Sequence, residues 1–165
     1  MSQKIETERK FLIEYPNIEV LSSLPDARVI RIMQIYLLSA DKSVDRRVRR
    51  SEEGERVVYT LTEKRRISAL SRTEDEREIS ASDYIELLRS ADGAFSPVIK
   101  TRVCIPFRDH VAEVDVYEGI TDFAIAEIEM RSEDDEVSLP PCLSLIREVT
   151  GENEYTNRAL AKREK

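Results

Sequence analysis

The sequence contains one histidine, His110, and two cysteines, Cys104 and Cys142, which excludes several common kinds of site. A single histidine rules out zinc centres built from several histidines and most catalytic schemes that use histidine as acid and base. Two cysteines are too few for a disulfide scaffold, so we expect each to be a small core residue in a reduced, cytoplasmic protein. His110 follows the turn-like pair Arg108-Asp109, and we expect it to be a solvated loop residue.

Glycine, proline and tryptophan are also scarce, with four, six and none among 165 residues. Disordered and low-complexity chains are far richer in glycine and proline, so a folded chain is expected. The start, MSQKIETERK, lacks the apolar segment of a secretory signal. The uncharged run over residues 32–40 is about half the ~20 residues that a membrane span needs. We therefore expect neither secretion nor a membrane partner.

Charged residues are abundant, and their balance is acidic. There are 26 lysines and arginines against 33 aspartates and glutamates, a net charge of -7. Because a surface that coats nucleic acid needs net positive charge, we expect no nucleic-acid partner. Hydrophobic residues make up 41% of the chain, which is enough for a core at this length. No linker or repeat divides the sequence, so we expect one domain over residues 1–165.

Apolar and polar residues alternate with a period of two in eight segments, which predicts strands. These strands are expected over residues 4–13, 28–38, 43–51, 56–64, 70–80, 97–106, 110–117 and 123–131. Residues 52–55 and 118–121 are predicted hairpin turns. Helices are expected over residues 17–24, 82–93, 142–149 and 155–165.

The polar faces of these strands carry like charges two residues apart. The pairs are Glu6/Glu8, Glu74/Glu76, Glu127/Glu129, Glu113/Asp115, Arg47/Arg49 and Lys100/Arg102. One such face is typical of a half-exposed sheet, but like charges on one face repel each other. Repetition on most strands requires compensation by neighbouring charges, metals or a ligand. Carboxylates bind hard cations such as Mg²⁺, and rows of basic residues bind phosphate. Both kinds lining one closed sheet predict a hydrated barrel that holds a metal–polyphosphate complex.

The same charged pairs form an ordered series that resembles the motifs of the CYTH domain, the family of triphosphate tunnel metalloenzymes. The first strand, Glu6-x-Glu8-x-Lys10, is similar to the ExExK motif of that family. The series continues with Gln34-Ile35-Tyr36, Arg47-x-Arg49, Thr62-Glu63-Lys64, Ser71-Arg72-x-Glu74-x-Glu76, Lys100-x-Arg102, Glu113-x-Asp115, Glu127-x-Glu129 and a final segment with Tyr155 and Arg158. The resemblance covers essentially the whole chain.

This resemblance implies an α+β fold that is mainly β. It implies an eight-stranded antiparallel closed barrel forming a charged tunnel, with helices packed outside and a C-terminal helix near the tunnel mouth. It also implies Mg²⁺ or Mn²⁺ as the cofactor. The implied metal ligands are Glu6, Glu8, Glu127 and Glu129, with Glu76 and Asp115. The implied catalytic residues are Glu74, Glu76 and Lys10. The implied triphosphate-binding residues are Lys10, Arg47, Arg49, Lys64, Arg72, Lys100, Arg102 and Arg158, and Glu113 has a less defined role.

The activity implied by the resemblance is hydrolysis of a small-molecule triphosphate, by direct attack of water on the terminal phosphorus. We expect tripolyphosphate to be preferred over ATP, because no aromatic pair in the motifs offers a surface for a nucleobase. Three alternatives stay open. They are a class IV adenylyl cyclase, a polyphosphate- or nucleotide-binding module without turnover, and a barrel held together by internal ion pairs. Both a monomer and a homodimer are compatible with the sequence.

Overall fold

The computed structural model describes the backbone of residues 2–162 and the side chains of residues 5–162. Within these residues the chain forms nine strands, three short α-helices and two 3₁₀ segments. The strands are β1 (Ser2–Ile13), β2 (Arg28–Tyr36), β3 (Val44–Glu53), β4 (Arg56–Arg66), β5 (Ser71–Ile79), β6 (Val98–Phe107), β7 (His110–Tyr117), β8 (Ala124–Glu129) and β9 (Leu145–Glu148). The helices are α1 (Ile18–Ser22), α2 (Ala81–Leu87) and α3 (Asn157–Ala161), with 3₁₀ segments η1 (Leu88–Ser90) and η2 (Asn153–Tyr155).

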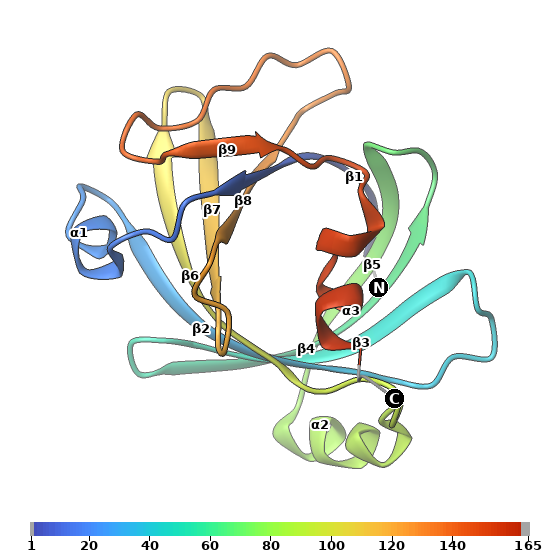
Figure 1. The fold of residues 1–165 in the computed structure, drawn as a ribbon. Helices are drawn as coiled ribbons and strands as arrows, with labels where there is room; N and C mark the ends of the chain where they lie inside the picture. Colours follow the sequence, from blue (N-terminus) through green and yellow to red (C-terminus); the bar gives the residue numbers. More distant parts are fainter. Residues whose placement is uncertain (1, 163–165) are drawn as a thin grey trace.

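The strands form one antiparallel sheet that closes into a barrel (Figure 1). Around the barrel the order is β5, β4, β3, β2, β6, β7, β8 and β1. β1 closes the ring because its first half, up to Thr7, pairs with β5, while its second half, from Glu8, pairs with β8. β9 adds an extra strand beside the end of β1. The expected eight-stranded closed antiparallel barrel is confirmed.

Helices α1 and α2 lie outside the barrel (Figure 1), and apolar side chains of the strands pack against them. α1 contributes Leu21 to a cluster that contains Val103 and Val114, and α2 places Tyr84 against Val48 and Leu61. Burial of these apolar faces stabilises the barrel through the hydrophobic effect. Because side chains alternate along a strand, the charged faces point into the barrel.

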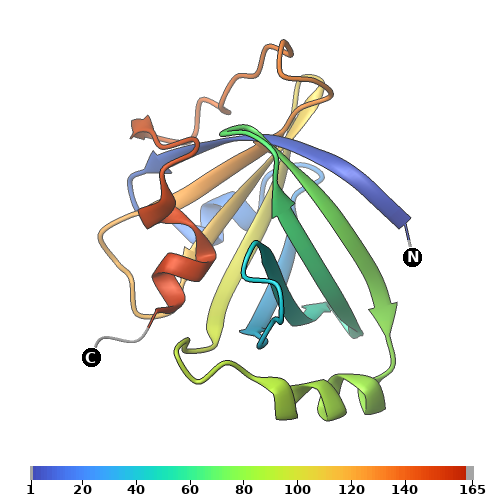
Figure 2. The ribbon, with the colours of Figure 1, turned by 90° about the vertical axis from the view of Figure 1, so that its right-hand side faces the viewer.

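A third apolar cluster lies near α3 and combines β-strand residues with the C-terminal segment. It contains Leu12, Tyr36, Tyr117, Ile125 and Ala161. Figure 2 shows α3 on the side of the barrel opposite the start of β1. The short helix begins at Thr156, whose hydroxyl caps the backbone N–H of Ala159. The C-terminal helix therefore stands at one end of the barrel, as expected.

Most predicted elements are confirmed within a few residues. The two predicted hairpin turns join β3 to β4 and β7 to β8, with Gly54 at φ +61° and Gly119 at φ +86°. Glycine adopts such left-handed angles without steric strain. Helix α1 lies within the predicted segment 17–24. Helix α2 lies within the predicted segment 82–93 except for its first residue, Ala81.

The predicted helix over residues 142–149 is wrong. Residues 145–148 form β9 instead, which pairs with Phe11 to Ile13 of β1. β5 begins at Ser71, opposite Thr7, so the following part of β1 has a free edge on that side. Pairing of its backbone groups with β9 outweighs the weak helical pattern of a short segment. The predicted helix over residues 155–165 is shorter than expected, because α3 covers only Asn157–Ala161, and residues 163–165 lie outside the described chain.

Two expectations for single residues also need correction. Cys104 is buried as expected, whereas Cys142 is exposed, because it follows two prolines in an irregular loop. His110 begins β7 rather than lying free in solvent, and its Nε2 is 2.8 Å from Asp135 Oδ2.

Among the described residues, no helix is long and apolar enough to cross a membrane.

Candidate functional site

The barrel interior contains a cavity of about 620 Å³ that opens near α3. It is lined by charged side chains from β1, β3, β4, β5, β6, β7 and β8 and from the C-terminal segment. The predicted site residues that line it are Glu6, Glu8, Lys10, Arg47, Arg49, Lys64, Arg72, Glu74, Glu76, Arg102, Glu113, Glu127, Glu129 and Arg158. Twelve of the predicted metal-binding, catalytic and phosphate-binding residues line the cavity from the strands, and Arg158 lines it from α3. Glu113 lines it too, whereas Lys100 and Asp115 do not.

The carboxylates gather on one wall. β5, β1 and β8 are neighbours in the barrel and contribute Glu74, Glu76, Glu6, Glu8, Glu127 and Glu129. The strand register places Glu8 directly opposite Glu129, at the short Cα separation of paired antiparallel residues. This wall concentrates six acidic side chains within three adjacent strands.

Burial and the closeness of the carboxylates shift the pKa values of several glutamates in the acidic wall. Burial, with the negative charges of Glu127 and Glu6, raises the pKa of Glu8 to about 8. Burial and hydrogen bonding to Glu6 raise the pKa of Glu74 to about 8. Burial opposes ionisation of Glu6 too, but the charge of Lys64 and hydrogen bonds outweigh it and lower the pKa of Glu6 to about 2. The wall therefore shares protons between neighbouring carboxyl groups at neutral pH.

Two guanidinium groups on β3 form the opposite side of the cavity. Arg47 and Arg49 both line it, and neither has a carboxylate partner among the side chains that the structure describes. Arg47 Nε is buried without a hydrogen-bond partner there. Burial, with the positive charges of Arg47 and Arg102, lowers the pKa of Arg49 to about 10, so Arg49 still keeps its charge at neutral pH. The cavity thus contains two buried guanidinium groups that form no direct ion pair with the described side chains, although carboxylates such as Glu6 and Glu76 act on them from a distance.

Gln34 of β2 holds Arg49 in place. Its Oε1 accepts hydrogen bonds from Arg49 Nε at 3.2 Å and from Nη2 at 3.0 Å. Gln34 is completely buried, so its own orientation is fixed by packing. A neutral acceptor orients the guanidinium without cancelling its charge.

Lys100 and Asp115 behave differently from the other predicted site residues. Lys100 Nζ lies 2.7 Å from Asp115 Oδ2, and both side chains are 0% exposed. Arg102 also donates to Asp115, at 2.7 Å and 2.8 Å, and to Glu113 Oε2 at 2.7 Å. Because their charges are matched inside the barrel wall, Lys100 and Asp115 do not reach the cavity. We assign them to the wall rather than to the ligand-binding surface.

Three further basic residues, Lys64, Lys10 and Arg72, contact carboxylates of the acidic wall. Lys64 Nζ lies 2.8 Å from Glu6 Oε2 and 3.7 Å from Glu74 Oε2. Lys10 Nζ lies 3.6 Å from Glu127 Oε1, and Arg72 Nη1 lies 3.9 Å from Glu8 Oε1. These cations line the cavity but are partly neutralised by the acidic wall.

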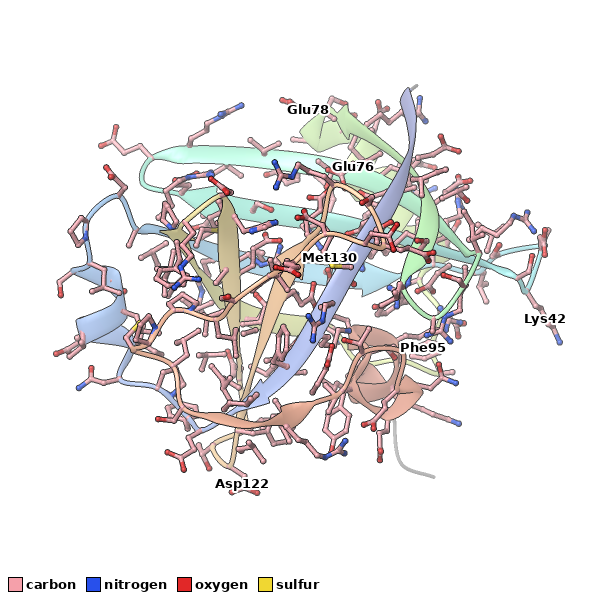
Figure 3. All side chains as sticks on the ribbon, turned by 90° about the horizontal axis from the view of Figure 1, so that it is seen from above. Lys42, Glu76, Glu78, Phe95, Asp122 and Met130 are labelled. Carbon is pink, nitrogen blue, oxygen red and sulfur yellow. The ribbon has the colours of Figure 1, made fainter. Side chains whose placement is uncertain are left out.

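The C-terminal segment builds the cavity mouth, as the family resemblance implied. Asn157 Oδ1 of α3 accepts a hydrogen bond from Tyr117 Oη at 2.5 Å. Arg158 Nη1 is 2.5 Å from Asp45 Oδ1, and Arg66 Nη1 donates to Asn153 Oδ1 at 2.9 Å. Figure 3 shows Phe95 beside α3, whereas Glu76 and Glu78 lie further from this helix.

Other lining residues were missed because they belong to no charge pair. They include Tyr36, Ser43, Asp45, Arg66, Phe95, Asn153, Thr156, Asn157 and Lys162. Arg66 is exposed, yet it lines the mouth. Tyr36 belongs to the Gln34-Ile35-Tyr36 motif but was given no role, and the sequence signal for others is their position near a motif, as for Arg66 after Lys64 and for Asn157 beside Arg158.

A divalent cation fits the acidic wall by charge and by donor type. All its donors are carboxylate oxygens, the ligands that Mg²⁺ and Mn²⁺ prefer. No three acidic side chains within residues 5–162 are already gathered at coordinating distance, because Glu6 turns to Lys64 and Glu127 to Lys10. The raised pKa values of Glu8 and Glu74 reflect burial and repulsion between neighbouring carboxylates. A bound cation would relieve this repulsion in place of the protons.

A smaller cavity of about 240 Å³ lies next to Arg49 and Arg102, which also line the main cavity. It shares Arg49, Arg102 and Glu113 with the main cavity and is also lined by Arg28 and Glu53. Arg28 and Glu53 form a two-point ion pair, with contacts of 2.8 Å and 2.6 Å. This pair crosses between β2 and β3 at the end of the barrel away from α3.

Comparisons with known proteins agree with this geometry. The chain is 30% identical to an inorganic triphosphatase of Nitrosomonas europaea over 160 residues, which is 94% of this chain and 96% of that protein. It is similar to a crystal structure described as an inorganic triphosphatase, with a TM-score of 0.56, 29% identity and coverage of 94% and 93% of the two chains. A Pyrococcus furiosus protein shares the fold, with a TM-score of 0.59, 20% identity and coverage of 79% and 81%. Residues 4–144 match the CYTH domain. The chain belongs to the CYTH domain family.

Proposed function

We propose that this protein is a divalent-metal-dependent triphosphatase that hydrolyses the terminal phosphate of inorganic tripolyphosphate or a related small triphosphate. One observation carries the proposal. A single cavity holds a wall of six carboxylates on β5, β1 and β8 and also contains the guanidinium groups of Arg47 and Arg49, which form no direct ion pair with the described side chains. A polyphosphate with its metal ion matches both walls at once. The similarity to an inorganic triphosphatase supports the same activity.

Arg47 and Arg49 hold the phosphate chain in this proposal. Guanidinium groups bind phosphate oxygens through paired, charge-assisted hydrogen bonds. Lys64, Arg72 and Lys10 add positive charge once their carboxylate partners bind a cation instead. Arg102 contributes its charge from the β6 side of the cavity, although Asp115 and Glu113 already neutralise part of it.

Glu6, Glu8, Glu127 and Glu129 would hold Mg²⁺ or Mn²⁺, because their oxygens share one wall of the cavity. When bound, such an ion neutralises phosphate oxygens and lowers the pKa of a coordinated water molecule. Without a bound cation, these carboxylates would repel a polyphosphate, since like charges repel.

Hydrolysis proceeds by direct attack of water on the terminal phosphorus. A new O–P bond forms, the bond from that phosphorus to the bridging oxygen breaks, and orthophosphate and pyrophosphate leave. Glu76 accepts the proton of the water in this proposal. Burial opposes its ionisation, but a hydrogen bond with Glu74 and the charge of Arg49 outweigh burial and lower the pKa of Glu76. Thr62 Oγ1 donates to Glu76 Oε2 at 3.0 Å and orients it.

A phosphate-release panel tests the proposed function. Tripolyphosphate, thiamine triphosphate, ATP and long-chain polyphosphate are each incubated with the protein and with Mg²⁺ or Mn²⁺. We expect orthophosphate from tripolyphosphate with at least one of the two ions. Formation of cyclic AMP and pyrophosphate from ATP would instead identify an adenylyl cyclase. Tight binding of all four compounds without any turnover would identify a binding module.

A further inference from the structure

The cavity mouth contains an aromatic pair that sequence motifs did not reveal. Phe95 and Tyr36 both line the cavity, with ring centroids 5.4 Å apart and planes tilted by 48°. Tyr36 is only 1% exposed, so its ring is enclosed by protein. Phe95 is partly exposed and is therefore the ring that a ligand entering the mouth would meet.

The guanidinium group of Arg158 covers this ring. Its Cζ lies 4.2 Å from the centroid of Phe95 and 5.3 Å from the centroid of Tyr36. A cation at this distance is attracted to the face of the ring. Asp45 holds the same guanidinium group from β3, with 2.5 Å between Nη1 and Oδ1.

The helix that carries Arg158 is itself anchored to the barrel. The neighbouring Asn157 accepts a hydrogen bond from Tyr117, which belongs to the buried interior. The backbone of Ser96, next to Phe95, donates to the carbonyl oxygen of Ala161 at 2.7 Å. Arg158 and Phe95 are therefore held against each other from both sides of their contact.

We propose that Arg158 is a specificity-determining residue that selects inorganic polyphosphate over nucleoside triphosphates. This inference rests on the proposed function and refines its substrate class. A nucleobase binds protein largely by stacking on an aromatic face, and Arg158 occupies the face that Phe95 would offer. With the ring covered, the mouth presents a guanidinium group to an incoming substrate. That surface complements a terminal phosphate and offers a base no apolar partner.

The decisive variant removes the cover while keeping the local charge balanced. Arg158→Ala is combined with Asp45→Asn, so that no unpaired carboxylate repels the substrates. We expect the ratio of kcat/KM for ATP to kcat/KM for tripolyphosphate to rise at least tenfold over the wild type. The gain should be larger for ATP than for CTP, because the purine presents more surface to the exposed ring. Adding Phe95→Leu should remove most of the gain.

Arg66→Ala is the matched control, because it removes another arginine from the same mouth. Arg66 bonds to Asn153 and Gly151 and contacts no aromatic ring among the described residues. We expect this variant to weaken ATP and tripolyphosphate alike and to leave their ratio unchanged. Melting temperatures of all variants are measured, and Arg158→Gln replaces Arg158→Ala if the latter does not fold.

An unchanged ratio in the Arg158 variant would overturn the inference, as would an equal rise in Arg66→Ala or a rise that persists without Phe95. The two proposals fail separately. Wild-type hydrolysis of tripolyphosphate with no change of ratio in the Arg158 variant contradicts this inference alone. Absence of hydrolysis contradicts the proposed function. If no hydrolysis is seen, the selectivity of the mouth is tested by the rise in melting temperature that ATP and tripolyphosphate each produce. The ratio of these two rises must still shift toward ATP in the Arg158 variant.

Discussion

At the scale of single residues, the partner of each basic side chain decides its role. Arg49 is held by a neutral amide and forms no direct ion pair, whereas Lys100 faces a carboxylate at 2.7 Å. Both were predicted from the same kind of motif, a basic pair with a spacing of two. The sequence predicts correctly that both point into the barrel. It does not show that β7 supplies Asp115 to one of them, because that requires the order of the strands.

Lys100→Met should therefore lower the stability of the ligand-free protein. The substitution leaves Asp115 with Arg102 alone in a fully buried site, and breaking a buried ion pair typically costs about 3–5 kcal/mol. Arg47→Gln is the matched comparison, since it removes a buried charge that has no carboxylate partner. Urea denaturation gives both values. A Lys100→Met variant as stable as Arg47→Gln would contradict the assignment of Lys100 to the wall.

Gln34 offers a second test, because in the proposed function it would affect the substrate only by positioning Arg49. Gln34→Leu removes the acceptor of two hydrogen bonds, and we expect KM for tripolyphosphate to rise about tenfold, equivalent to about 1.4 kcal/mol. Gln34→Glu should raise KM further, because a carboxylate neutralises Arg49. Steady-state kinetics with tripolyphosphate measures both. If Gln34→Glu has the lower KM of the two, Gln34 does not position Arg49 in the way proposed.

At the scale of elements, β1 organises the site. Its first half pairs with β5 and its second half with β8, which brings three acidic strands side by side. The alternation that predicted each strand follows from local sequence, and this is why the strands are correct. β9 was missed because its formation depends on a free edge of β1, a feature of the assembled barrel that no local pattern contains.

The docking of α3 must rest on contacts with the barrel, because a helix of five residues is not stable alone, and we expect the partly buried Asn157 to contribute most. Asn157 accepts from Tyr117 at 2.5 Å and lies 3.4 Å from Lys100 Nζ. Asn157→Ala should raise the amide hydrogen exchange of residues 157–162 at least tenfold and leave the strands unchanged. Asn153→Ala, which removes an exposed hydrogen bond to Arg66, is the control. Unchanged exchange in Asn157→Ala would show that other contacts hold the helix.

At the scale of the whole molecule, the barrel is inverted relative to an ordinary small protein. Its apolar core lies outside the strands, under α1 and α2, while charged residues fill the interior. Burial of so many charges costs free energy unless they are paired or bind a ligand. Pairing accounts for Lys100, Asp115 and Arg102, and the metal–polyphosphate ligand that we propose would account for the acidic wall and for Arg47 and Arg49. The family resemblance predicted the charged interior, but it placed Lys100 and Arg102 among the phosphate-binding residues and Asp115 among the metal ligands, whereas the structure pairs them with one another.

The most direct test of this account is the rate of orthophosphate release from tripolyphosphate as Mg²⁺ or Mn²⁺ is added to metal-stripped protein. The account predicts no release above the buffer rate without metal and a saturable rise with it. It also predicts a rate lower by orders of magnitude for Glu8→Gln, which keeps the shape of the side chain but removes the charge that binds a hard cation. Full turnover of the wild type in excess EDTA, or wild-type rates for Glu8→Gln at saturating metal, would contradict it.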